Sequence, residues 1–241
     1  MHNNVKLLIV YAHTNVAERR YGLERSSKDE KEMNWQVVTF FGDSTVLLPS
    51  AAVLFIVLFL RKDSKQLAWH WALLFGITGA IVCASKLAFM GWGIGIRELD
   101  FTGFSGHTAL SSAFWPILLW LLCARATPAL RFTAVVFGYA LAGLVGYSRL
   151  MVHAHSTSEV IAGLLLGAAG SAAFLLLQSR VRDTHTAQLS FGGLASMVII
   201  PALLLNTGAK APTQSLLGEI AVKIGPLEKP FTRADLHKEF Y

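Results

Sequence analysis

The stretch 67–90 reads LAWHWALLFGITGAIVCASKLAFM, an almost unbroken apolar run. About 20 predominantly apolar residues are enough to cross the hydrocarbon core of a bilayer as an α-helix. Inside lipid every backbone N–H and C=O must find its partner within the protein, and a helix satisfies this requirement by itself. The stretch therefore predicts a transmembrane helix.

Five further apolar stretches resemble it in composition. The six stretches occupy residues 44–60, 67–90, 108–123, 132–147, 160–178 and 189–205. Of the 241 residues, 54% are hydrophobic and 15% charged, and the mean hydropathy is +0.50. About a quarter of the residues of a soluble domain are charged. We therefore expect an all-α fold, a polytopic membrane bundle of about six transmembrane helices.

Small residues recur at a spacing of four on two of these stretches. Gly163 and Gly167 form a GxxxG pair, and Gly138, Ala142 and Gly146 repeat along the fourth stretch. Residues of this size let the backbones of two helices approach closely. Glycine is also simply common in membrane helices, so the pattern alone leaves both interpretations open.

The polar sequence outside the spans suggests three parts. They are an N-terminal tail (1–43), a six-helix core (44–206) and a polar C-terminal tail (207–241). The end of the first tail, 31–43, is amphipathic, and we expect it to lie at the headgroup level with Trp35, Phe40 and Phe41 as anchors. We expect the C-terminal tail to be a surface appendage.

The distribution of Lys and Arg predicts the orientation. Loops 61–66, 124–131 and 179–188 are rich in both, and the opposite loops, 91–107 and 148–159, are poor. Basic loops remain in the cytoplasm, although basic residues just ahead of the first span weigh against this orientation. We expect an integral protein of the bacterial inner (plasma) membrane with its poorly charged loops outside.

The net charge of +6 suits contact with anionic membrane lipids. No nucleic-acid-binding module accompanies that charge, and nothing in the sequence indicates an oligomeric state. The two cysteines, Cys83 and Cys123, are too few for a disulfide framework or a metal cluster.

Polar and ionisable residues, which are energetically unfavourable in a membrane, gather on the predicted outer side of the bundle. Ionisable groups within or beside membrane spans are expensive and usually face a functional cavity. The set consists of Lys86, Arg97, Ser105, His107, Arg149, His155 and Glu159. Unrelated interfacial residues would not be expected to fall on one side, so the set predicts a site.

The third span opens with FSGHTAL, residues 104–110. Ser105 is a suitable N-cap for a helix. The same helix start offers free N–H groups to an anion, and Gly106 permits a close backbone approach. His107 adds a group that gives or takes a proton near neutral pH.

A second polar segment, GYSRLMVHAHSTSEVIAG, spans residues 146–163. Arg149 carries a planar fork suited to two phosphate oxygens. His155 and Glu159 are four residues apart, which places them on one face of a helix. Alternatively, Arg149 snorkels to the interface and Glu159 only completes a capping box with Ser156. Cations, a helix start, two histidines and a carboxylate together predict phosphate chemistry with a nucleophile and an acid.

These two segments resemble the type-2 phosphatidic acid phosphatase superfamily, which includes membrane lipid phosphatases and vanadium haloperoxidases. Its motifs are a Lys with a downstream Arg-Pro, then Pro-Ser-Gly-His, then Ser-Arg-x5-His-x3-Asp. The matching residues are Lys86 with Arg97, Phe104 to His107, and Ser148-Arg149 through His155 to Glu159. The resemblance covers about residues 42 to 170.

The resemblance implies a lipid phosphatase-like core and a metal-independent reaction without cofactors. His155 would be the nucleophile, His107 the proton donor, and Glu159 the residue that orients His155. The phosphate would be bound by Lys86, Arg97, Ser105, Gly106 and Arg149. The substrate would be a lipid phosphomonoester or pyrophosphate. A lipid phosphotransferase using the same phosphoenzyme, or a non-catalytic homologue that binds or transports lipid phosphate, are the alternatives.

Three positions depart from the family pattern. Ten residues separate Lys86 from Arg97 instead of six, so that Gly93 stands at the usual position of the Arg. Phe104 replaces Pro, and Glu159 replaces Asp. His153 has the wrong spacing from Arg149 for the nucleophile and is expected at the rim.

Overall fold

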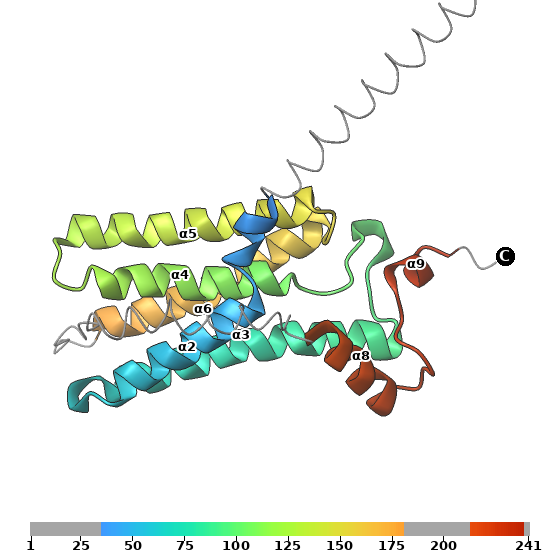
Figure 1. The fold of residues 1–241 in the computed structure, drawn as a ribbon, viewed down its shortest axis with the longest axis horizontal. Coiled ribbons are helices and arrows are strands. Elements are labelled where there is room, and N and C mark those ends of the chain that lie inside the picture. Colours follow the sequence, from blue (N-terminus) through green and yellow to red (C-terminus); the bar gives the residue numbers. More distant parts are fainter. Residues whose placement is uncertain (1–34, 181–212, 239–241) are drawn as a thin grey trace, which may run out of the picture.

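A computed structural model describes residues 35–180 and 213–238, and helices make up most of this part (Figure 1). After a helical turn at residues 35–40, the elements are α2 (Ser44–Phe59), η1 (Lys62–Ser64), α3 (Lys65–Trp92), η2 (Arg97–Leu99), α4 (Gly106–Leu122), α5 (Pro128–Met151), α6 (Thr157–Arg180), α8 (Thr213–Ile224) and α9 (Arg233–Leu236). The prediction of an all-α fold is confirmed.

Four helical stretches of the described chain are long and apolar enough to cross a membrane. They are Trp35–Phe59, Lys62–Trp92, Pro128–Met151 and Thr157–Ser179. A fifth apolar helix, Gly106–Leu122, is shorter. These five helices contain the first five predicted spans. The sixth, 189–205, and the tail up to residue 34 lie outside the described residues.

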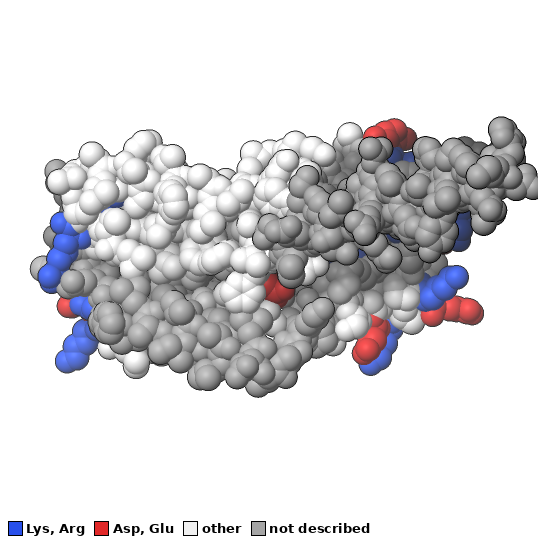
Figure 2. Space-filling model, turned by 45° about the horizontal axis from the view of Figure 1, so that its top comes forward, with Lys and Arg blue, Asp and Glu red and all other residues white. Residues whose placement is uncertain are grey.

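The surface of the bundle is that of an integral membrane protein. In Figure 2 the Lys, Arg, Asp and Glu side chains gather mainly at the two ends, and the described surface between them is almost entirely uncharged. Large apolar side chains in mid-helix are exposed there: Leu73 is 62% exposed, Phe137 64% and Leu165 64%. Soluble proteins rarely expose such wide apolar surface, whereas lipid tails cover it without cost.

Helix α4 lies between α5 and α6, and glycines set the spacing. A Cβ added to Gly138 would lie 2.5 Å from Cα of Pro116, and one added to Gly167 would lie 2.1 Å from the carbonyl oxygen of Ala109. Only glycine fits at such contacts. The small residues on the fourth and fifth spans therefore do mediate close helix packing.

An aromatic cluster fixes α3, α4 and α6 together at the end of the bundle opposite the polar segments. The buried ring of Trp71 lies 5.9 Å from that of Phe114 and 6.4 Å from that of Phe174. Such edge and tilted contacts add to the apolar area that the rings bury. The cluster makes this end a rigid base for the helix ends at the other.

The short segment before α2 packs onto the bundle. Trp35 meets the ring of Tyr147 on α5 at 5.2 Å, and the indole N–H of Trp115 on α4 donates to the carbonyl of Phe41 at 3.0 Å. The expected aromatic anchors thus contact α4 and α5.

The described C-terminal segment, 213–238, packs against the end of α3. Helix α8 comes close enough that a Cβ on Gly91 would lie 3.2 Å from the carbonyl oxygen of Ala221. Beyond it, the amide of Phe231 donates to the carbonyl of Met90 at 2.8 Å. Figure 1 shows α8 crossing the same end of the bundle at which α4 and α6 begin. The expectation of a mere surface appendage does not describe this packing.

Candidate active site

Three helices and the loop after α5 bring polar residues together at one end of the bundle. Lys86 lies near the end of α3, His107 in the first turn of α4, and Arg149 in the last turn of α5. His155 lies in the loop that follows α5. All four side chains, with Gly106, line one cavity of about 1460 Å³. The structure thus brings five of the predicted site residues to a common space.

The central contact joins His155 to Glu159. Nδ1 of His155 lies 2.7 Å from Oε2 of Glu159, and the Glu159 side chain is completely buried. A proton on Nδ1 shared with a carboxylate leaves the lone pair on Nε2. The contact therefore favours the tautomer of His155 with a free Nε2, and the extra methylene of Glu does not prevent the contact.

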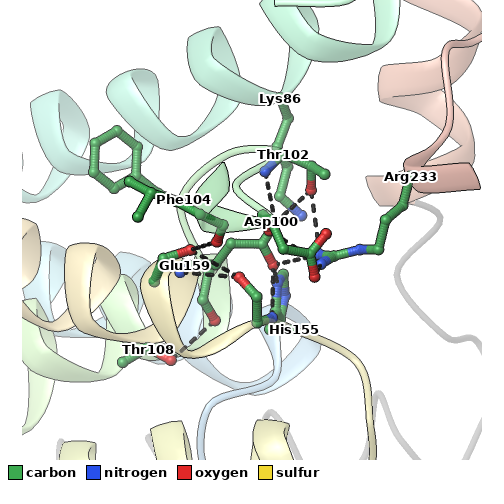
Figure 3. A network of polar contacts seen from close by, with 12 residues as sticks. Lys86, Asp100, Thr102, Phe104, Thr108, His155, Glu159 and Arg233 are labelled. Atoms are coloured by element: carbon green, nitrogen blue, oxygen red, sulfur yellow. Dashed lines mark hydrogen bonds and ion pairs between the residues drawn. The ribbon is translucent and has the colours of Figure 1, made fainter. Parts of the chain in front are cut away.

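Glu159 is held by several donors besides His155 (Figure 3). Oε1 accepts from the amide of Thr102 at 2.8 Å and from the Thr102 hydroxyl. Oε2 accepts from the amide of Ser156 at 3.1 Å and from Nη2 of Arg233 at 2.7 Å. These contacts fix the carboxylate in position.

The capping interpretation of Glu159 also holds. The Ser156 hydroxyl accepts from the Glu159 amide at 3.4 Å while the Glu159 carboxylate accepts from the Ser156 amide. This reciprocal pair is a capping box at the start of α6. One carboxylate therefore both begins the helix and orients His155.

The environment of His155 favours its neutral form. Burial lowers the pKa of His155, and the hydrogen bond and charge of Glu159 raise it part of the way back. The charges of Lys86 and Arg149 lower the pKa further. A neutral imidazole at neutral pH is the state that can attack phosphorus.

Two cations face the cavity from different helices. Nζ of Lys86 donates to Oε1 of Gln214 at 3.2 Å. The buried Nε of Arg149 has no hydrogen-bond partner within the described part of the chain. A phosphate oxygen is a natural acceptor for a guanidinium group placed in this way.

The start of α4 is built as the sequence suggests, except for the side chain of Ser105. Ser105 is the N-cap residue, but its hydroxyl makes no capping bond and instead pairs with the Thr108 hydroxyl at 2.9 Å. The Ser105 side chain is fully buried and is not part of the cavity lining. Gly106 does line the cavity, and the first turn of a helix presents free N–H groups.

Asp43 was not predicted from the sequence, yet it lies beside His107. Its Oδ2 is 3.7 Å from Nε2 of His107. Asp43 also caps α2, because its other oxygen accepts from the amide of Thr45 at 2.8 Å. An Asp just ahead of an apolar span is typical of a helix cap, but nothing in the sequence indicates that Asp43 lies close to His107.

Arg97 lies apart from the cluster. Gly93 ends α3 with φ of 70°, and an antiparallel bridge between Ile96 and Phe101 closes a tight loop whose tip carries Arg97. Its Nη2 reaches the carbonyl of His237 at 3.4 Å, and Arg97 does not line the cavity. The four additional residues between Lys86 and Arg97 are used by this loop. His153, expected at the rim, is exposed.

The C-terminal segment supplies a wall of the cavity, which the sequence did not indicate. Its lining residues include Gln214, Leu217, Phe231 and Arg233. Arg233 contacts both Glu159 and Asp100. Within the described ranges 35–180 and 213–238, no three His, Cys, Asp or Glu side chains are grouped so that they could hold a metal ion.

The chain is similar in sequence to known proteins. The sequence pattern of the PAP2 superfamily matches residues 92–183, which include His107, Arg149, His155 and Glu159. An uncharacterized 22.5 kDa protein of the cps region of Klebsiella pneumoniae is 72% identical over 207 residues, which cover 86% of this chain and 99% of that protein.

A solved structure shares the fold. The transmembrane PAP2 type phosphatidylglycerolphosphate phosphatase of Bacillus subtilis aligns with a TM-score of 0.50 at 19% identity. The alignment covers 64% of this chain and 79% of that one. At this identity the likeness concerns the arrangement of the helices.

Proposed function

The chain belongs to the PAP2 superfamily, and on that premise we propose that it hydrolyses a lipid phosphomonoester or pyrophosphate through a phosphohistidine on His155. One observation carries the proposal. An imidazole backed by a buried carboxylate, a second histidine and two cations converge on one cavity at one end of the bundle.

The first half-reaction transfers the phosphoryl group to the protein. The Nε2 lone pair of His155 forms a bond to phosphorus as the bond to the lipid oxygen breaks. His107 donates a proton to that departing oxygen. Lys86, Arg149 and the N–H groups at the start of α4 stabilise the charge that builds on the phosphoryl oxygens.

The second half-reaction returns the enzyme to its starting state. A water molecule attacks phosphorus, His107 takes its proton, and the bond between phosphorus and Nε2 breaks. Inorganic phosphate leaves, and His155 regains its lone pair. Glu159 stabilises the cationic phosphoimidazole between the two steps.

The shape of the cavity supports a lipid substrate. Lys86, Cys83, Val82, Gly79, Gly76 and Phe75 line it from one face of α3. At 1.5 Å per residue, this face runs about 16 Å from the cationic end toward the middle of the bundle. That length is close to one leaflet of the hydrocarbon core, so an acyl or prenyl tail can lie along it while the phosphate stays at the cations.

The test is phosphate release from defined lipids. The protein is purified in detergent with EDTA and offered phosphatidate, phosphatidylglycerol phosphate and undecaprenyl pyrophosphate. We expect release from at least one lipid and a loss of about 1000-fold or more in His155→Ala. Labelled phosphate from the best substrate should appear on wild type as an acid-labile, alkali-stable adduct, and not on His155→Ala. Turnover that survives His155→Ala would refute the mechanism.

We also propose that the protein lies in the bacterial inner membrane with the site outside the cytoplasm. Arg61, Lys62, Lys65, Arg125 and Arg131 lie at the end of the bundle opposite the site, and basic loops stay in the cytoplasm. A fluorescent-protein reporter fused after Arg182 should fluoresce, and an alkaline phosphatase reporter there should be inactive. The reverse result would invert the orientation.

A further inference from the structure

We propose that Arg233, from the C-terminal segment, is a positioning residue that completes a three-member array with Glu159 and His155. Its guanidinium group neutralises the buried carboxylate and thereby sets how strongly that carboxylate holds the proton of His155. This inference rests on the proposed function, because it assigns Arg233 a part in the same reaction. It also extends the machinery to a segment beyond the residues that match the family pattern.

The contacts hold the guanidinium group from two sides. Nη2 of Arg233 lies 2.7 Å from Oε2 of Glu159, the oxygen that also accepts from His155. Nη1 donates to the carbonyl of Asp100 at 3.1 Å and to the Asp100 carboxylate. Figure 3 shows Arg233 reaching in from the C-terminal segment to meet the Glu159 carboxylate, which His155 also contacts. The planar fork of Arg suits such two-sided recognition.

The segment that carries Arg233 is anchored independently of that contact. The Phe231 amide donates to Met90, and the Phe231 ring lies 5.4 Å from the Phe89 ring. Thr232 and Asp235 form a capping box that starts α9 at Arg233. The backbone is therefore fixed next to the end of α3, and this position places the Arg233 side chain beside Glu159.

The charge on Glu159 explains why a cation is needed there. Glu159 is completely buried, and an ionised carboxylate without a compensating charge is costly in such a place. While His155 is neutral, it contributes no positive charge to Glu159. The guanidinium group of Arg233 supplies positive charge directly beside the carboxylate, so Glu159 can remain ionised while His155 is the neutral nucleophile.

Removing Arg233 should therefore strengthen the hold of Glu159 on the proton of His155. The titratable and charged groups around the pair come from every neighbouring element. They are Asp43 at the start of α2, Lys86 on α3, Asp100 beside η2, His107 on α4, Arg149 on α5, Glu159 on α6, Glu219 and Lys223 on α8, and Arg233 on α9. Of these, Arg233 is the cation in direct contact with Glu159, so its loss acts first on the carboxylate and through it on His155.

The test compares Arg233→Gln and Arg233→Lys with Lys238→Gln. Lys238 is a matched control, because it lies on the same segment and its ion pair is with Asp235, away from the cavity. With phosphatidylglycerol phosphate as the probe, we expect Arg233→Gln to lower kcat about tenfold and to move the acidic limb of kcat/KM up by about one pH unit. Arg233→Lys should recover part of both, and Lys238→Gln should match wild type.

Two results would overturn the inference while the proposed function stands. One is a wild-type rate and pH profile in Arg233→Gln. The other is a loss of rate in both Arg233 variants with an unmoved acidic limb, which a purely structural role would produce.

A measurement without turnover separates the two proposals. The imidazole of His155 is titrated by NMR in histidine-labelled wild type and Arg233→Gln, with His155→Gln used to assign its signal. If no lipid is hydrolysed, the proposed function fails, and a higher pKa of His155 in Arg233→Gln still supports the array. An unchanged His155 pKa in Arg233→Gln overturns the array whether or not the protein is active.

Discussion

Oδ2 of Asp43 lies 3.7 Å from Nε2 of His107, where α2 and α4 begin. In the proposed reaction, a carboxylate at this distance can stabilise the proton that His107 carries to the departing lipid oxygen. The pairing gives each histidine a carboxylate of its own, Asp43 for His107 and Glu159 for His155.

Asp43→Asn should weaken His107 as an acid without breaking α2, because Asn caps a helix as well as Asp does. The effect depends on the leaving group. An alkoxide needs a proton to leave, whereas a lipid phosphate leaves readily without one. We expect kcat to fall about tenfold for phosphatidate and clearly less for undecaprenyl pyrophosphate. Equal losses on both substrates would contradict this role, and Asp63→Asn, at the far end of the bundle, is the control.

The pH dependence of kcat/KM should report the protonation of His155. Burial lowers its pKa and Glu159 partly raises it again, so the neutral nucleophile persists below the ordinary value of about 6.5. Activity should therefore be retained below that value and fall only at the lower pH at which His155 takes up a proton. Glu159→Gln removes the charge that raises the pKa, so its acidic limb of kcat/KM should move to lower pH while kcat drops.

The measurement is kcat/KM of wild type and Glu159→Gln between about pH 5 and pH 8. A limb that moves to higher pH in Glu159→Gln would mean that the carboxylate does not act on His155 as described. This shift is opposite in sign to the one expected for Arg233→Gln, so the two variants check each other.

Arg149 and Arg97 should differ sharply, although the family pattern assigns both to phosphate. Arg149 lines the cavity, and Arg97 lies on a loop tip that faces His237. We expect Arg149→Ala to lose about 100- to 1000-fold in kcat and Arg97→Ala to stay near wild type with the best lipid substrate. A large loss in Arg97→Ala would show that the loop closes over the substrate.

Contacts within one helical turn could be predicted from the sequence. The capping box at Ser156 follows from a spacing of three residues at a helix start. The spacing of four residues predicted the His155–Glu159 contact, although His155 lies just before the N-cap of α6 and not on the helix itself. The first five membrane spans follow similarly from composition. The glycine pattern alone left two interpretations open, and only the contacts of Gly138 and Gly167 decide for close helix packing.

Contacts between distant segments could not be predicted in this way. Arg233 meets Glu159 across 74 positions of sequence, and the contact depends on how the C-terminal segment packs on α3. No spacing encodes that packing. The predicted place of Arg97 beside the phosphate differs from its place in the structure for a local reason. The tight turn between Ile96 and Phe101 directs the Arg97 side chain away from the cavity and toward His237.

The apolar part of the cavity should select for tail length. Gly76 lines the cavity, and nothing lies within 4 Å of a Cβ built on it. Gly76→Phe would fill this distal end, about 15 Å from Lys86 along α3. We expect KM to rise about tenfold for dipalmitoyl phosphatidylglycerol phosphate and to stay unchanged for the dihexanoyl form, because burying each CH₂ is worth about 0.8 kcal/mol. Gly143→Phe, equally open but outside the cavity, is the control, and equal effects on both chain lengths would refute a tail site.

Helix α5 offers a matched pair of glycines that tests the packing of the bundle. A Cβ on Gly138 would meet the backbone of Pro116, which cannot move aside as a side chain can, whereas Gly143 has nothing within 4 Å. Gly138→Ala should therefore force α4 and α5 apart and lower the free energy of unfolding by about 1 to 3 kcal/mol. Gly143→Ala should be neutral or slightly stabilising, because Ala is the better helix former. The two variants are compared by their thermal unfolding in detergent. Equal Tm values would mean that α4 and α5 are not packed through Gly138, and the position of Arg149 at the end of α5 would then need another explanation.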